Sequence, residues 1–105
     1  MSNQFNNVSI TKSANIYFDG KVTSRTITFG DGSTKTLGIM SPGEYEFSTQ
    51  APELMEITQG ELEVLLPNQS EWQSIQGGQS FNVEGNSSFK LKINTITDYI
   101  CTYLN

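Results

Sequence analysis

One carboxylate stands out among the residues whose chemistry could matter. Glu53 opens the segment ELMEIT and lies on the same face as Met55 and Ile57 if that segment is a strand. A carboxylate held among apolar side chains is partly desolvated, and its charge then acts more strongly than in water. Two interpretations follow: Glu53 serves chemistry at a site, or it anchors neighbouring backbone through hydrogen bonds.

Other side chains that commonly do chemistry are scarce. The chain contains no histidine, so no imidazole base is available. Its single cysteine, Cys101, cannot form an internal disulfide and has no base beside it in the sequence. We therefore expect a buried, inert thiol, as suits a reducing compartment. The six lysines and arginines are the only cationic side chains available to an anionic ligand, apart from backbone N–H groups.

Size and charge limit the class of protein. The chain has 105 residues, which indicates one domain with one core. Its net charge of −5 argues against nonspecific binding to nucleic acid or to an anionic membrane. The apolar runs are too short for a transmembrane helix, and the N-terminal stretch does not resemble a signal peptide. We expect a cytoplasmic protein with neither nucleic acid nor membrane among its partners.

Strands, not helices, are expected to position these residues. Apolar residues recur with period two, and turn signals such as GDGS, SPG and QGGQS separate the alternating segments. This spacing indicates an all-β sandwich or barrel. The predicted strands are 23–29, 34–40, 44–49, 51–58, 61–67, 72–75, 80–83, 89–93 and 98–104. Residues 1–14 are predicted to be a flexible or edge-strand N-terminal arm, followed by one domain over residues 15–105.

Two segments resemble the sequence motifs of the cupins. From Gly43 to Gly60 the chain has the layout of the first motif, with Glu53 and Gly60 at that motif's separation. From Gly78 through QSFNV to Phe89 it has the layout of the second. The resemblance implies a single-domain cupin, which is a small jelly-roll β-barrel.

The departures from those motifs bear on metal binding. Phe47 and Thr49 occupy the two histidine positions of the first motif, and Phe89 occupies that of the second. One carboxylate cannot replace three imidazole ligands at a transition-metal site. We therefore expect none of the metal-dependent reactions typical of cupins.

A more specific resemblance covers nearly the whole chain after the arm. The strings YFDGKV, LGIMSPGEYEFSTQAPELMEITQGELEVLLP, FNVEG and DYICTYL, in that order and with Trp72 among them, are similar to the bacterial pyrimidine/purine nucleoside phosphorylase family. The resemblance implies a metal-independent cupin that needs no cofactor. It also implies cleavage of diverse ribonucleosides with inorganic phosphate, which yields the free base and ribose 1-phosphate.

That reaction favours the functional interpretation of Glu53. Phosphorolysis at the anomeric carbon passes through an oxocarbenium-like transition state, as glycoside hydrolysis does. Glu53 is the predicted catalytic residue, either balancing the developing positive charge or holding sugar hydroxyls. No side chain is an obvious general acid for the leaving base, so an inward tyrosine or a solvent molecule is left for that role.

The remaining site residues follow from the same resemblance. Phe47 and Phe89 are predicted to stack the base or flank the ribose, since stacking tolerates any base. Tyr45 is also expected to point inward, where a core role is favoured over substrate contact. Thr49 is predicted to bond a sugar oxygen, with backbone bonding as the alternative. Lys21 and Lys35 are the predicted phosphate ligands, although most such lysines are solvated surface.

Two other functions compete with the enzyme. A non-catalytic cupin that binds a sugar or nucleoside-like molecule would have the same pocket but no turnover. A structural protein would have a barrel filled with its own side chains, which the carboxylate among apolar positions disfavours. Small cupins often pair through sheet edges or faces, so a homodimer is expected by resemblance.

Overall fold

The computed structural model describes residues 3–104, and the regular structure within them is almost entirely β. The elements are β1 (Ser9–Ile10), β2 (Asn15–Tyr17), the 3₁₀ turn η1 (Phe18–Gly20), β3 (Val22–Thr28), β4 (Thr34–Met40), β5 (Gly43–Ser48), β6 (Glu53–Gln59), β7 (Glu61–Leu65), β8 (Gln73–Gln76), β9 (Ser80–Val83), β10 (Ser88–Ile93) and β11 (Thr97–Tyr103). Every predicted strand has a counterpart, with ends that agree to within two residues. The all-β prediction is confirmed.

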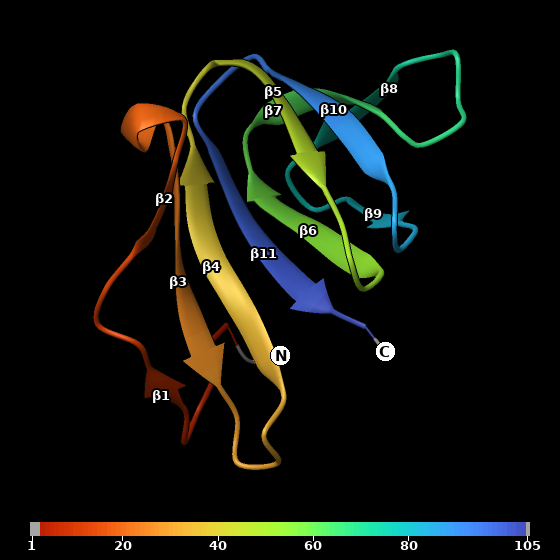
Figure 1. Ribbon diagram of the computed structural model, residues 1–105. Coiled ribbons are helices and arrows are strands. Elements are labelled where there is room, and N and C mark those ends of the chain that lie inside the picture. The colour runs from red at the N-terminus through yellow and green to blue at the C-terminus, as the bar shows by residue number, and fades with distance from the viewer. Residues whose placement is uncertain (1–2, 105) are drawn as a thin grey trace.

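The strands form two antiparallel sheets that face each other (Figure 1). The larger sheet has the order β1-β3-β4-β11-β6-β9, and β2 also pairs with β3. The smaller sheet has the order β5-β10-β7-β8. The chain passes between the sheets at β4–β5, β5–β6, β6–β7, β8–β9, β9–β10 and β10–β11, so strands distant in sequence become neighbours.

One core fills the space between the sheets, because alternate residues of each strand face inward. The larger sheet contributes Val22, Met40, Met55, Ile57, Phe81, Val83, Tyr99 and Cys101. The smaller sheet contributes Tyr45, Leu62, Val64, Ile75, Phe89, Leu91 and Ile93. The predicted inward faces of residues 61–67 and 89–93 are confirmed by this burial.

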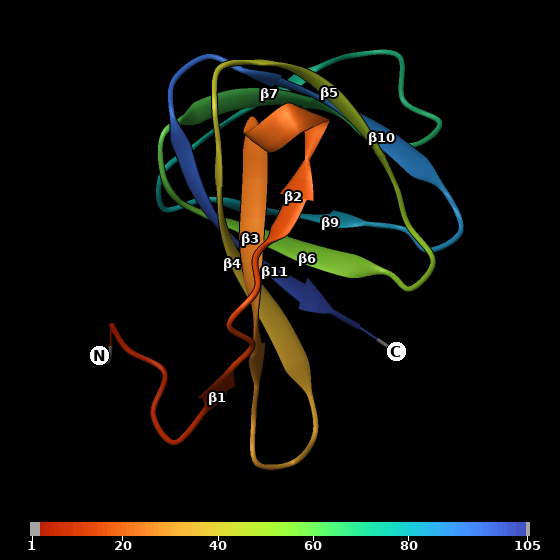
Figure 2. The same cartoon turned by 60° about the vertical axis from the view of Figure 1, so that its left-hand side comes forward.

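The N-terminal segment lies along the outer end of β3 and β4. β1 pairs with β3 as a short edge strand, and Figure 2 shows the segment running beside the lower half of the hairpin. The Phe5 ring lies edge-on to the Phe29 ring, with 5.4 Å between centroids. Residues 1–2 of the predicted arm lie outside the described residues, and the boundary at residue 14 stays a prediction.

A short strap follows β2 and crosses the edge of the smaller sheet. Phe18 and Asp19 both have left-handed backbone conformations, with φ of 51° and 57°. This turn directs the Phe18 ring onto Tyr45 and Phe47, at centroid distances of 4.9 and 5.4 Å. The strap therefore joins β2 of the larger sheet to β5 of the smaller one.

Over residues 3–104 no helix has the length and apolar character needed to cross a membrane.

Candidate active site

A cavity of about 540 Å³ opens between the two sheets, where β5 leads into β6. Its lining residues are Tyr17, Ser24, Thr36, Met40, Phe47, Ser48, Thr49, Gln50, Ala51, Glu53, Met55, Phe89, Tyr99, Cys101 and Tyr103. The volume is within the usual range for small-molecule sites. Glu53 is the only charged side chain of this lining, and the structure describes every lining residue.

Glu53 lies at the first position of β6, between two neighbouring strands. It is paired with Tyr103 on β11 and with Val83 on β9. Burial raises the pKa of the Glu53 carboxyl, and a hydrogen bond with the Cys101 thiol acts in the opposite direction. The carboxylate is therefore less well solvated than a surface glutamate, which strengthens its interaction with any positive charge in the cavity.

Three aromatic rings form one side of the cavity, and we call Tyr17, Phe47 and Phe89 the aromatic wall. The rings of Phe47 and Phe89 are stacked, with 5.9 Å between centroids and 27° between planes. Tyr17 meets Phe47 edge-on at 6.0 Å. Phe47 and Phe89 pair directly across β5 and β10, so the wall is built on the smaller sheet, and β2 brings Tyr17 against it.

Thr49 and Tyr45 have hydroxyl groups that already bond to backbone. Thr49 lines the cavity, yet its hydroxyl donates to the Glu84 carbonyl at 2.7 Å and accepts from the Ser87 N–H at 3.1 Å. The Tyr45 hydroxyl donates to the Ser41 carbonyl at 2.7 Å, and its ring belongs to the core. Tyr45 is not among the lining residues. Substrate contact by either side chain stays a prediction.

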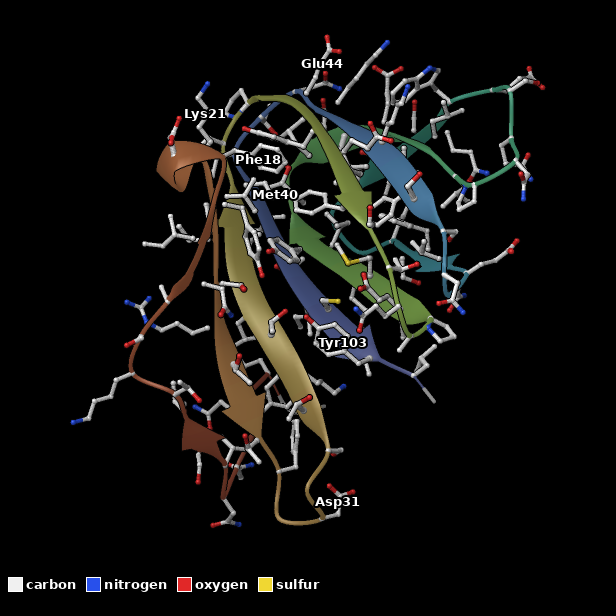
Figure 3. All side chains as sticks on the ribbon, in the orientation of Figure 1. Phe18, Lys21, Asp31, Met40, Glu44 and Tyr103 are labelled. Atoms are coloured by element: carbon white, nitrogen blue, oxygen red, sulfur yellow. The ribbon has the colours of Figure 1, made fainter. Side chains whose placement is uncertain are left out.

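The two lysines predicted to bind phosphate do not line the cavity. Lys35 lies on the outer face of the larger sheet, where its Nζ is 5.3 Å from the centre of the Phe5 ring and 5.9 Å from that of Phe29. Lys21 is exposed just after η1, and its side chain points away from the sheets (Figure 3). Phosphate binding by either lysine stays a prediction.

Four hydroxyl groups form the other side of the cavity, and we call Ser24, Thr36, Tyr99 and Tyr103 the hydroxyl wall. They come from the neighbouring strands β3, β4 and β11 of the larger sheet. The hydroxyl of Tyr99 lies near that of Ser24, and the hydroxyl of Tyr103 lies near that of Thr36. In Figure 3 the Tyr103 side chain, near the end of β11, projects into the space between the sheets.

The phenols of this wall stay protonated at neutral pH. Burial raises the pKa of Tyr103 to about 12. Burial also raises the pKa of Tyr99 above its ordinary value, although the nearby Ser24 hydroxyl opposes the change. Both tyrosines therefore present neutral O–H groups, which can donate hydrogen bonds.

Gly38 makes the hydroxyl wall possible. It lies between Ser24 and Tyr99 in the register of β3, β4 and β11. A Cβ at this position would lie 2.7 Å from Cε1 and Cζ of Tyr99 and 2.3 Å from the Thr23 carbonyl oxygen. Because glycine has no Cβ, the Tyr99 ring lies across β4 and its hydroxyl reaches Ser24. The sequence carried a signal for this contact, a lone glycine within a strand pattern.

Cys101 lies between the two walls and beside Glu53. Its side chain is buried, which confirms the prediction from the sequence. Burial, together with the charge of Glu53 and a hydrogen bond to it, raises the pKa of the thiol to about 12. A thiol in this state is a poor nucleophile at neutral pH. Over residues 3–104 no three carboxylate or thiol side chains are grouped as metal ligands would be.

Comparison with known proteins identifies the family. The family profile described as pyrimidine/purine nucleoside phosphorylase matches residues 12–103. The chain belongs to the pyrimidine/purine nucleoside phosphorylase family. A member of that name from Chlorobium chlorochromatii is 63% identical over 101 residues, which is 96% of this chain and 97% of that one. Another, from Colwellia psychrerythraea, is 60% identical over 102 residues, which is 97% of this chain and 98% of that one.

Solved structures share the architecture of this family member. A crystal structure of a protein of unknown function from Acinetobacter sp. ADP1 is 41% identical, with a TM-score of 0.95 over 98% of this chain and all of that one. An RmlC-like cupin from Shewanella frigidimarina is 16% identical, with a TM-score of 0.69 over 95% of this chain and 86% of that one. The second likeness concerns the fold alone and confirms the predicted single-domain cupin.

Proposed function

We propose that the cavity is the active site of a broad-specificity nucleoside phosphorylase. It cleaves purine and pyrimidine ribonucleosides with inorganic phosphate to free base and ribose 1-phosphate. The names of its relatives support this reaction. The observation that carries it is a single partly buried carboxylate, Glu53, in a cavity with aromatic rings on one side and hydroxyl groups on the other.

In this proposal Glu53 stabilises the transition state. As the bond between the anomeric carbon and the base lengthens, positive charge develops on the ribose ring. A desolvated carboxylate beside the ring attracts that charge more strongly than a solvated one would. The neutral ground-state ribose gains less from the same carboxylate, so the interaction lowers the barrier instead of only improving binding.

Broad specificity follows from the aromatic wall. Rings of Phe47 and Phe89 can stack on purines and pyrimidines alike, because every base has a π-face. Neither phenylalanine can read the hydrogen-bonding edge of a base. The wall would therefore bind bases by area and position, with Tyr17 closing the open side of Phe47.

We also infer where the protein works, its oligomeric state and its cofactor requirement. We infer a cytoplasmic homodimer that uses phosphate as co-substrate and no metal or cofactor. The net charge of −5 and the single reduced thiol are compatible with the cytoplasm. Leu37 and Ile39 are exposed on the outer face of the larger sheet, which offers apolar surface to a second copy. Light scattering tests the dimer through its mass. Activity after chelation tests whether the enzyme works without a metal.

The function is tested by following base release from uridine and adenosine, with and without phosphate. Wild-type protein should release base only with phosphate, and Glu53→Gln should lower kcat by about a hundredfold or more. Glu56→Gln is the matched control, because Glu56 is on the same strand but faces away from the cavity. The control should keep wild-type activity.

Two results would contradict the proposal. Phosphate-dependent release that survives in folded Glu53→Gln would exclude the catalytic role of this carboxylate. No release from any nucleoside would exclude the enzyme. Thermal stabilisation by nucleosides without turnover would then favour the non-catalytic binding cupin.

A further inference from the structure

We propose that the hydroxyl wall, rather than a lysine, binds the phosphate co-substrate. This inference rests on the proposed function and adds to it the place where phosphate binds. The wall consists of Ser24, Thr36, Tyr99 and Tyr103, which all line the cavity.

The hydroxyl groups have donors to spare. Each hydroxyl carries one proton and two lone pairs. All four hydroxyl groups of the wall line the cavity, and each can rotate its proton toward a ligand. Asn15 Nδ2 donates to Ser24 Oγ at 3.2 Å, so the contact with Asn15 uses a lone pair and no hydroxyl proton. Ser24 therefore keeps its O–H group as a donor, and each of the other three hydroxyl groups of the wall brings one more.

These donors are held in place before any ligand arrives. Ser24 and Thr36 are 4% and 5% exposed, on adjacent strands of one sheet. The Tyr99 ring is fixed across Gly38. A hydrogen bond from a hydroxyl to a phosphate oxygen is strengthened by the charge of the acceptor. Donors that are already oriented lose little entropy on binding, so a cation is not essential for affinity.

The placement of the two walls suits the chemistry. Phosphate attacks the anomeric carbon as the bond to the base breaks, and direct displacement puts nucleophile and leaving group on opposite faces of the sugar. The electron pair of the broken C–N bond leaves with the base, which takes up a proton, and a phosphate oxygen forms the new C–O bond. With the base against the aromatic wall, the incoming phosphate lies toward the hydroxyl wall.

The electrostatics of the cavity separate this site from a lysine site. Glu53 is the only charged lining residue, so the phosphate would meet neutral donors and no ion-pair partner. An exposed lysine attracts phosphate through a field that salt screens within about 8 Å at physiological ionic strength. Hydrogen bonds from neutral hydroxyl groups are much less sensitive to salt, because these groups carry no net charge to be screened. The two kinds of site therefore differ in how the KM for phosphate depends on ionic strength.

The test is a series of single hydroxyl deletions. Ser24→Ala, Thr36→Val, Tyr99→Phe and Tyr103→Phe each remove one oxygen and leave the backbone and the rings in place. Each should raise the KM for phosphate about tenfold or more, which corresponds to the loss of one hydrogen bond to a charged acceptor. The KM for uridine should change by about twofold or less, and the wild-type KM for phosphate should change little between low and high salt.

Control variants come from the same strands. Thr102→Val removes a hydroxyl on the outer face of β11, next to Cys101 and Tyr103, where the Thr102 hydroxyl has no hydrogen-bond partner among residues 3–104. It should keep the wild-type KM for both substrates. Lys21→Ala and Lys35→Ala test the competing lysine sites and should leave the KM for phosphate unchanged.

Each other outcome overturns the inference. If the deletions raise the KM for uridine and spare that for phosphate, the hydroxyl wall binds the ribose instead. If Lys21→Ala or Lys35→Ala raises the KM for phosphate in a salt-dependent way, phosphate binds at that lysine. Absence of phosphorolysis in the wild-type protein would be a failure of the proposed function, and it is recognised before any variant is made.

Discussion

The two walls of the cavity recognise ligands by different physics. The aromatic wall offers ring faces, whose contacts depend on area and tolerate changes in the partner. The hydroxyl wall offers directional donors, which discriminate strongly because an unmatched polar group is left unbonded. The base that binds at the aromatic wall can therefore vary, whereas the part of the ligand that binds at the hydroxyl wall cannot. One small cavity can then combine tolerance for the leaving group with selectivity for the nucleophile.

The walls also differ in how they are built. Phe47 and Phe89 are directly paired across two strands, so the stacked pair depends on local register alone. Tyr99 reaches Ser24 across an intervening strand, and this contact requires a glycine at position 38. We therefore expect the hydroxyl wall to be the more easily broken by a change in the scaffold.

The largest effect is expected from Gly38→Ala. The new methyl group would meet the Tyr99 ring and the Thr23 carbonyl at distances that no real Cβ tolerates. Overpacking of this kind costs about 3 kcal/mol. Because the Tyr99 ring must move, the KM for phosphate should also rise. Urea unfolding measures the first effect and steady-state kinetics the second.

Gly30→Ala is the matched control for this substitution. Gly30 lies in the turn after β3, and a Cβ there would have no atom within 4 Å. Its free energy of unfolding and its kinetics should match those of the wild type. Equal stability of the two alanine variants would show that the Tyr99 ring does not depend on Gly38.

A somewhat smaller effect is expected from Phe47→Ala, which breaks the aromatic wall. Loss of one stacking surface costs about 2 kcal/mol, or roughly thirtyfold in the KM for a nucleoside. Uridine and adenosine should both be affected, and the KM for phosphate should not. Phe47→Leu separates stacking from simple burial, since leucine restores apolar area but no ring.

The comparison between nucleosides and phosphate is what makes the Phe47→Ala result informative. An equal rise in both KM values would indicate a collapsed cavity, and retained circular dichroism and melting temperature must exclude that. An unchanged KM for nucleosides would place the base elsewhere. Phe47 is preferred to Phe89 here because Phe89 is only 3% exposed and its truncation would also weaken the core.

The sequence predicted the strands and the two phenylalanines of the aromatic wall for identifiable reasons, but it did not single out Tyr17. Period-two alternation is a local signal, and it placed the β-strands correctly. Phe47 and Phe89 were found because they occupy motif positions of the cupin resemblance, and both line the cavity. Alternation alone also puts Lys35 on the face opposite Thr36, which is where the structure has it.

The hydroxyl wall could not be predicted in the same way. Ser24, Thr36 and Tyr99 come from segments separated in sequence. Ser24 lies outside the strings that carry the family resemblance, as does Thr36, and Tyr99 lies in one of them, DYICTYL, which assigns it no role. Which hydroxyls meet depends on the register of β3, β4 and β11, which is a long-range property of the sheet. Only Gly38 gave a local hint, since a glycine inside a strand often marks a close approach.

Glu53 gives a prediction for how stability depends on pH. Because the pKa of Glu53 is raised in the folded protein, the folded state binds more protons than the unfolded state at pH values between the ordinary and the raised pKa. Stability should therefore fall as pH rises through that interval, starting near the ordinary value of 4.5. Glu53→Gln lacks this titration. Its melting temperature relative to that of the wild type should therefore rise through the interval and then level off.

Melting curves of both proteins over the acidic range test this sign. A constant difference in melting temperature from pH 4 to pH 8 would mean that Glu53 titrates alike in the folded and unfolded chains. Glu56→Gln again serves as the control, because it removes a carboxylate from the same strand on the face turned away from the cavity. The outcome also bears on the mechanism, since it reports how strongly the cavity desolvates the carboxylate.

The smallest expected effect comes from Cys101, whose thiol hydrogen-bonds Glu53 and thereby opposes the rise of that carboxyl's pKa. Cys101→Ala removes the hydrogen bond and so raises the folded-state pKa further, so the fall in stability should start at the same pH and extend to higher pH. Cys101→Ser keeps a donor at the same position and should bring the upper end of the fall back toward its wild-type pH. Identical profiles for the alanine and serine variants would show that the thiol only fills space, and the carboxylate would then owe its state to burial alone.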